Sequence, residues 1–171
     1  MNDFLNVEKK LNYRCLSIVL GLLLSFGSLG TAYFLEYQMN VQPCPLCILQ
    51  RWVLWAMGFL FVLNLLWYRQ KWLSWILLSL NGVFALAGIG LAGRQLWLQS
   101  LPSGAAPSCG ASFERLLETY PWFDAIRHVL TTAGECAEIP IRILGLSLPN
   151  WTLISFLGLS LLCLYQAKYL K

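Results

Sequence analysis

The stretch CPLCILQRWVLWAMGFLFVLNLLWY, residues 44–68, decides the fold. Its part from Ile48 to Tyr68 is apolar and has the roughly 20 residues that a helix needs to cross the hydrocarbon core of a bilayer. Three further blocks have a similar character: Cys15 to Phe34, Trp72 to Leu91 and Leu148 to Tyr165. The sequence therefore predicts an all-α membrane protein, a bundle of four transmembrane helices at about 15–34, 48–68, 72–91 and 148–165.

The composition agrees with this class. Of the 171 residues, 58% are hydrophobic and 12% are charged, and the mean hydropathy is +0.61. Soluble domains are nearer half apolar and a quarter charged. Four spans leave no room for a separate soluble domain, so we expect residues 1–171 to form one membrane domain.

The first apolar block could instead belong to a signal peptide, because the basic residues Lys9, Lys10 and Arg14 precede it. However, the block is longer than the 7–15 residues of a usual signal-peptide core, and no clear A-x-A cleavage site closes it. We therefore expect a retained helix.

Lysine and arginine in the short flanking segments predict the orientation. The loop from Leu35 to Pro43 contains neither residue. The flanking cations are Lys9, Lys10, Arg14, Arg69, Lys71, Lys168 and Lys171. Both termini are therefore expected in the cytoplasm, with Cys44 and the long segment 94–147 on the other side. The net charge of +4 reflects this asymmetry and does not indicate nucleic-acid binding.

A Cys-x-x-Cys motif, Cys44 to Cys47, stands at the start of the second predicted helix. The positive end of a helix favours a thiolate, which is the reactive form of cysteine. Arg51 follows Cys47 by four residues and shares its helix face. A cation beside a thiolate at the membrane edge indicates an electron-transfer site.

The six cysteines divide by compartment. Cys44, Cys47, Cys109 and Cys136 are predicted on the non-cytoplasmic side, where disulfides persist. Four cysteines allow three pairings; adjacency favours Cys44 with Cys47, which leaves Cys109 with Cys136. Cys15 and Cys163 are predicted at the cytoplasmic ends of their helices, as small buried apolar residues.

The external segment from Phe113 to Leu130 has apolar residues near helical spacing, interrupted at Pro121. It predicts two short amphipathic helices, which either lie on the membrane surface or pack against the end of the bundle. His128, the only histidine, falls here and is interpreted as an exposed or packing residue rather than a base.

For several residues of the second and third predicted helices, the sequence allows two roles. Gln50 could hydrogen-bond near the site or face a neighbouring helix, and Arg94 could bind lipid headgroups or position the external segment. Four glycines of the third helix predict close helix packing: Gly82, Gly88, Gly90 and Gly93.

Together these features resemble the disulfide bond formation protein B (DsbB) family, bacterial inner-membrane oxidases that use quinone to reoxidise the periplasmic dithiol oxidase DsbA. The resemblance covers nearly the whole chain. Its most specific parts are Cys44–Cys47 with Arg51, Gly93-Arg94-Gln95, Gly134-Glu135-Cys136-Ala137-Glu138, and Leu144 to Trp151. It implies a bacterial inner-membrane location, with the active site at the periplasmic face.

The resemblance also implies a role for each site residue. A DsbA-like periplasmic partner would attack Cys109, and Cys136 would then exchange with Cys44. Cys47 would face ubiquinone or menaquinone, with Arg51 stabilising negative charge there. Some family members carry a histidine where Ser100 stands in this chain, so a histidine relay is not implied. Besides DsbA and the quinone pool, the expected partners are membrane lipids. Nucleic acid is not expected as a partner.

Three alternatives belong to other classes. A vitamin K epoxide reductase-like enzyme is also quinone-linked, but its Cys-x-x-Cys lies on the last helix of its core bundle. Four cysteines could form a metal site, but the second pair is widely spaced and lacks a nearby histidine, so no metal is expected. A membrane subunit with purely structural disulfides would not explain Arg51.

Overall fold

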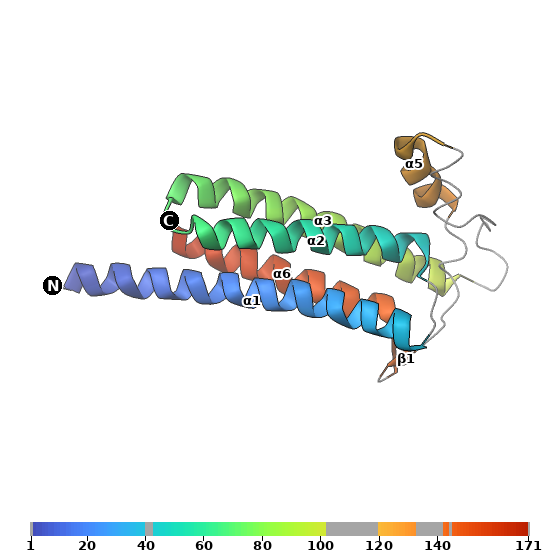
Figure 1. Ribbon diagram of the computed structural model, residues 1–171, viewed down its shortest axis with the longest axis horizontal. Coiled ribbons are helices and arrows are strands. Elements are labelled where there is room, and N and C mark those ends of the chain that lie inside the picture. The colour runs from blue at the N-terminus through green and yellow to red at the C-terminus, as the bar shows by residue number, and fades with distance from the viewer. Residues whose placement is uncertain (1, 40–42, 102–119, 133–141, 144, 171) are drawn as a thin grey trace.

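The computed structural model describes residues 2–39, 43–101, 120–132, 142–143 and 145–170. Four long helices run side by side (Figure 1): α1 Asn2–Met39, α2 Pro45–Leu66, α3 Lys71–Ser100 and α6 Leu148–Leu170. Each contains an apolar window long enough to cross a membrane, with a mean hydropathy of 1.5 to 1.9. The predicted bundle of four membrane helices is confirmed.

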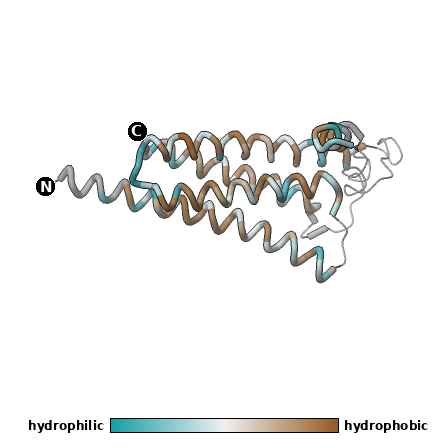
Figure 2. The backbone as a smooth tube through the Cα atoms, turned by 45° about the horizontal axis from the view of Figure 1, so that its top comes forward, coloured by the Kyte–Doolittle hydropathy of each residue, from teal (hydrophilic) through white to brown (hydrophobic). Residues whose placement is uncertain are grey.

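Short elements lie at one end of this bundle. Helix α5, Trp122–Thr132, lies near the start of α2, and strand β1, Arg142–Ile143, pairs antiparallel with β2, Leu146–Ser147, just before α6. Both chain termini lie at the opposite end (Figure 1). Apolar residues run along all four long helices, and hydrophilic residues gather at the turn between α2 and α3 (Figure 2).

The helix boundaries differ from the predicted ones. Helix α3 was predicted to end at 91 but continues to Ser100, so the external segment does not begin at 94. The added turns carry Gln95 and Leu98, whose side chains are 3% and 1% exposed, because they pack against neighbouring elements rather than lipid. Helix α1 extends beyond 15–34 in both directions, α6 continues past 165 to Leu170, and α2 runs from Pro45 to Leu66 instead of 48–68.

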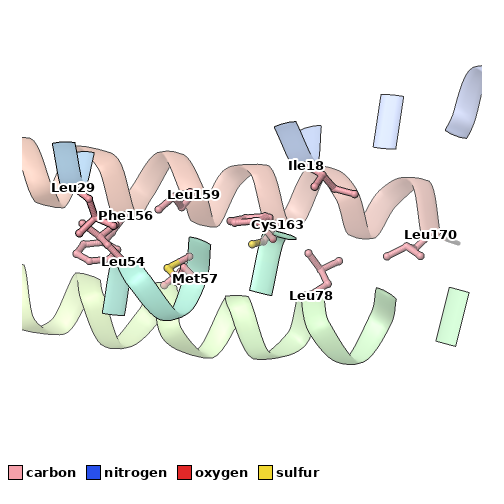
Figure 3. Close-up of a cluster of buried hydrophobic side chains, with 11 residues drawn as sticks. Ile18, Leu29, Leu54, Met57, Leu78, Phe156, Leu159, Cys163 and Leu170 are labelled. Carbon is pink, nitrogen blue, oxygen red and sulfur yellow. The ribbon is translucent and has the colours of Figure 1, made fainter. Parts of the chain in front are cut away.

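The core lies along the axis of the bundle, between all four long helices (Figure 3). Phe61 of α2 and Phe156 of α6 belong to it, and both are 0% exposed. Cys163 belongs to this cluster at 6% exposure, which confirms its interpretation as a buried apolar residue, whereas Cys15 is half-buried. Large apolar side chains outside the core face outward along the spans, where a bilayer is their solvent.

Gly88 of α3 lies against the Phe156 ring of α6. A Cβ atom at Gly88 would lie 2.4 Å from the ring of Phe156, so only glycine fits without a shift. A Cβ atom at Gly82, Gly90 or Gly93 would meet nothing within 4 Å among the described residues. The prediction of close packing is therefore confirmed for Gly88, whereas the described residues show no such contact for the other three glycines.

Polar side chains link the helices inside the bundle. Near the chain termini, Arg14 is 4% exposed and donates to the Tyr68 carbonyl oxygen at 2.6 Å and to Ser74 Oγ at 3.0 Å. Asn64 Nδ2 of α2 donates to Gln166 Oε1 of α6 at 3.3 Å. Such bonds satisfy polar groups that an apolar interior would otherwise penalise.

Candidate functional site

Cys44 caps the N-terminus of α2. Its backbone is extended, with φ −68° and ψ 159°, and its Sγ accepts a hydrogen bond from the Cys47 backbone N–H at 3.4 Å. Pro45 takes the first helical position, where a missing N–H costs nothing. The sequence thus places one sulfur at the positive end of the helix, where negative charge is favoured.

The two sulfurs of the motif are neighbours. Sγ of Cys44 and Sγ of Cys47 lie 2.9 Å apart in hydrogen-bond contact, and both residues are half-buried. This separation is longer than the about 2.05 Å of a disulfide bond. Closing this contact to a disulfide bond would need only a small side-chain movement, together with the transfer of two electrons and two protons to an oxidant.

A glutamine from α3 contacts both sulfurs. Gln95 Nε2 lies 3.3 Å from Cys44 Sγ and 3.2 Å from Cys47 Sγ. Gln95 Oε1 in turn accepts a hydrogen bond from Gln50 Nε2 of α2 at 2.9 Å. Gln50 therefore combines the two roles that the sequence left open. It faces the neighbouring helix α3, and its bond to Gln95 links it indirectly to the thiols.

Arg51 makes its described contacts with α1. Its guanidinium forms an ion pair with Glu36, donates to the Ala32 carbonyl oxygen at 3.3 Å and lies 4.9 Å from the centre of the Tyr33 ring. The contacts described for Cys47 are with Cys44 and Gln95. Glu36 was missed by the sequence reasoning; its signal was a lone carboxylate just beyond the first apolar block.

Helix α5 packs against the start of α2. Val129 is 1% exposed and forms a small core with Leu46 of α2 and Leu98 of α3, against which Cys44 is packed. Trp122 and Phe123 of α5 are exposed at 69% and 77%. The packing interpretation holds for the Val129 face of this helix.

The remaining predicted positions have simpler surroundings. Ser100 Oγ donates to the Trp97 carbonyl oxygen at 2.6 Å, and Ser147 Oγ donates to Gln99 Oε1 at 2.9 Å. Arg94 lines an apolar groove of about 520 Å³ between α2, α3 and α5. The side chain of His128, the first predicted amphipathic piece, Cys109 and Cys136 lie outside the described residues.

The fold and the site define a multi-pass membrane protein with a pair of neighbouring cysteines at the mouth of a membrane helix. A family model described as "Disulfide bond formation protein DsbB" matches residues 14–166. The chain belongs to the DsbB family.

Individual relatives agree with this assignment. The chain is 41% identical over 132 residues to "Disulfide bond formation protein B" of Hahella chejuensis, covering 77% of this chain and 80% of that protein. It is 42% identical over 139 residues to the protein of the same name from Marinobacter nauticus, covering 81% and 83%. For the Acinetobacter baumannii protein of that name the identity is 40% over 158 residues, covering 92% of each chain.

Proposed function

We propose that this chain reoxidises a periplasmic DsbA-like dithiol protein and passes the electrons to a quinone, as a protein-dithiol:quinone oxidoreductase. Membership of the DsbB family makes it an oxidoreductase acting on disulfides. The observation that carries the proposal is the pair of sulfurs, 2.9 Å apart, at the N-terminus of a membrane helix.

The proposed chemistry uses two disulfides in sequence. A thiolate of the partner attacks Cys109, forming a mixed disulfide while the bond to Cys136 breaks. The Cys136 thiolate then attacks Cys44, and the electron pair of the Cys44–Cys47 bond leaves on the Cys47 sulfur. The second partner thiolate resolves the mixed disulfide with Cys109, and transfer is completed when Cys109 displaces Cys44 from Cys136.

The chain lengths on either side of α5 support these separate roles for Cys109 and Cys136. Cys136 follows the end of α5 at Thr132 by four residues, a chain length that spans at most about 14 Å. Helix α5 is packed against the same small core as Cys44. Cys109 lies eight residues beyond Leu101 and can extend about 29 Å from it, which suits a residue that meets an external partner.

We assign the quinone to the end of α2 near α1, because a quinone has a planar ring, two carbonyl acceptors and an apolar tail, and Arg51 and Tyr33 lie there. A guanidinium has five N–H donors, so the contacts of Arg51 with Glu36 and Ala32 do not exhaust it. Tyr33 supplies an aromatic face beside Arg51, and Trp55, 49% exposed, borders Tyr33 on the apolar flank. Arg51 and Cys47 would hold the ring of this quinone, a ubiquinone or a menaquinone.

A bound quinone supplies an acceptor for two electrons and two protons. Cys44 and Cys47 release that number when they form a disulfide. DsbA is already a strong oxidant, near −120 mV, and for a two-electron couple about 30 mV corresponds to about 1.4 kcal/mol. An ordinary structural disulfide lies far below this potential, so a stronger acceptor dissolved in the bilayer explains why the enzyme is a membrane protein.

The proposed location is the bacterial inner membrane, with the thiols at the periplasmic face and both termini in the cytoplasm. The exposed cations Arg69, Lys71 and Lys168 lie at the end of the bundle away from Cys44, as the positive-inside rule requires of the cytoplasmic end. The vitamin K epoxide reductase-like alternative is set aside because the family match is to DsbB.

The test mixes the purified protein with a reduced DsbA-like partner and ubiquinone-1 and follows quinone absorbance. We expect reduction that is abolished by Cys44→Ser and by Cys47→Ser. We also expect Cys136→Ser to accumulate a partner adduct on Cys109. Reduction that survives both serine variants would refute the redox role, and an adduct on Cys44 would refute the order of exchange.

A further inference from the structure

The Gln95 amide has an unusual position for a polar group inside a membrane bundle. Its side chain belongs to a residue only 3% exposed, and its single NH₂ group lies 3.3 Å and 3.2 Å from the two sulfurs. An amide NH₂ has two N–H donors, and this one lies within hydrogen-bond distance of either sulfur. A thiolate accepts such hydrogen bonds more strongly than a neutral thiol, because hydrogen bonds with an ionised partner are the stronger kind.

Gln50 supports the orientation of the Gln95 amide. Its Nε2 donates to Gln95 Oε1 at 2.9 Å, and Gln50 is itself only 2% exposed. With the oxygen of Gln95 engaged, the NH₂ group faces Cys44 and Cys47. In an apolar interior neither amide is easily left without a partner, so the pair holds its orientation.

Negative charge moves between these sulfurs during the exchange. When an incoming thiolate bonds to Cys44 Sγ, the Cys44–Cys47 bond breaks and its electron pair leaves on Cys47 Sγ. Donors aimed at the place where charge develops lower the barrier without reorganising. The described contacts of Arg51 lie on the α1 side, whereas Gln95 approaches the sulfurs from α3.

We propose that Gln95 is a catalytic hydrogen-bond donor that stabilises the thiolates of Cys44 and Cys47, and that Gln50 is the positioning residue that orients it. This inference rests on the proposed function for its place in the exchange. The hydrogen bonds themselves act on the thiols whether or not a quinone or a protein partner is present, and this allows a separate test.

The test measures thiol reactivity without either substrate. In the full-length protein, Cys15, Cys109, Cys136 and Cys163 are replaced by alanine, the Cys44–Cys47 pair is reduced, and alkylation by iodoacetamide is followed by mass spectrometry from pH 5 to 10. In this background we compare Gln95→Met, Gln50→Met and Gln99→Met. Gln99 is the matched control, since it lies one turn further along α3 and its described bond is to Ser147.

We expect Gln95→Met to lower the alkylation rate at neutral pH about tenfold, which corresponds to about 1.4 kcal/mol, and to move the pH profile upward by about one unit. Gln50→Met is expected to give a smaller shift in the same direction, and Gln99→Met none. If Gln95→Met does not fold, the Gln50→Met profile decides.

Two outcomes would overturn the inference: unchanged profiles in Gln95→Met and Gln50→Met, or an equal shift in Gln99→Met, which would reveal a general effect of removing a glutamine from the bundle. Because no quinone enters this assay, a shifted profile in a protein that fails to reduce quinone would sink the proposed function and leave the Gln95 assignment standing.

Discussion

Arg51 of α2 forms an ion pair with Glu36 of α1, at the end of the bundle that carries Cys44 and Cys47. Their side chains are 14% and 26% exposed, so this is a partly buried pair rather than a freely solvated one. An unpaired arginine at a membrane edge is costly, and Glu36 offsets that cost. The pair also fixes the guanidinium beside Tyr33, where its other N–H donors remain for a ligand.

Arg51→Lys is the substitution that tests this arrangement. A lysine keeps the charge but loses the planar fork that reaches Glu36 and the Ala32 carbonyl together. Hydrogen bonds to charged groups contribute about 1.5–3 kcal/mol, so we expect the KM for ubiquinone-1 to rise about tenfold or more. Steady-state quinone reduction measures it.

The control for this variant is exchange of the Cys44–Cys47 disulfide with a small dithiol, which we expect to change little. Glu36→Gln should raise the KM less than Arg51→Lys, because the contact with Ala32 remains. A KM in Arg51→Lys equal to that of the wild type would remove Arg51 from the quinone site.

Gly88 offers a test of packing with an internal control. In Gly88→Ala the new methyl group would meet the buried Phe156 ring at 2.4 Å, and overpacking of this kind typically costs about 1–3 kcal/mol. Gly82→Ala, on the same helix, meets nothing within 4 Å among the described residues and is expected to be neutral or stabilising by up to about 1 kcal/mol. Thermal unfolding in detergent compares the two. Equal Tm values would contradict the close contact of α3 with α6.

The sequence predicts the four spans because lipid leaves the backbone little choice: a crossing segment must satisfy its own hydrogen bonds, and a long apolar run shows where it does so. The sequence predicts the ends of these helices less well. Helix α3 continues past its apolar block because Gln95 and Leu98 are buried by protein, and hydropathy does not distinguish a polar residue that meets a partner from one that meets water.

The same reason limits the prediction of the site. Cys44 and Cys47 are adjacent in the chain, so their proximity follows from local helix geometry. The contacts of Gln95 with the sulfurs and of Glu36 with Arg51 join residues of different helices. They depend on which faces of α1, α2 and α3 meet. When a helix is apolar on most sides, its sequence does not indicate which face packs against its neighbours.

Arg14→Met tests the other end of the bundle. Arg14 donates to the Tyr68 carbonyl oxygen and to Ser74 Oγ, and so ties α1 to the turn between α2 and α3. Loss of these charged hydrogen bonds in a residue only 4% exposed should cost about 1.5–3 kcal/mol. Ser74→Ala removes one contact and should cost less. Unfolding in mixed micelles measures both, and an equal loss in the two variants would show that the Tyr68 contact contributes nothing.

Val129→Asp tests the docking of α5. A carboxylate among Leu46 and Leu98 is unfavourable, so we expect this helix to leave the end of the bundle. Oxidation of the protein partner should then slow several-fold, whereas quinone reduction driven by dithiothreitol at Cys44–Cys47 should be nearly unchanged. The matched variant is Phe123→Asp, on the same helix at 77% exposure, which should affect partner oxidation less. Equal slowing in both variants would rule out a specific role for the Val129 contact.

Two amide pairs hold α2 against two different helices: Gln50 with Gln95 of α3, and Asn64 with Gln166 of α6. Their α2 members are 14 residues apart, close to four full turns, so they share one side of the helix. Inserting a single residue between them would rotate one relative to the other by about 100° and break a pair. The number of residues in α2 between Gln50 and Asn64 is therefore fixed by these two contacts, and a one-residue insertion there should destabilise the bundle.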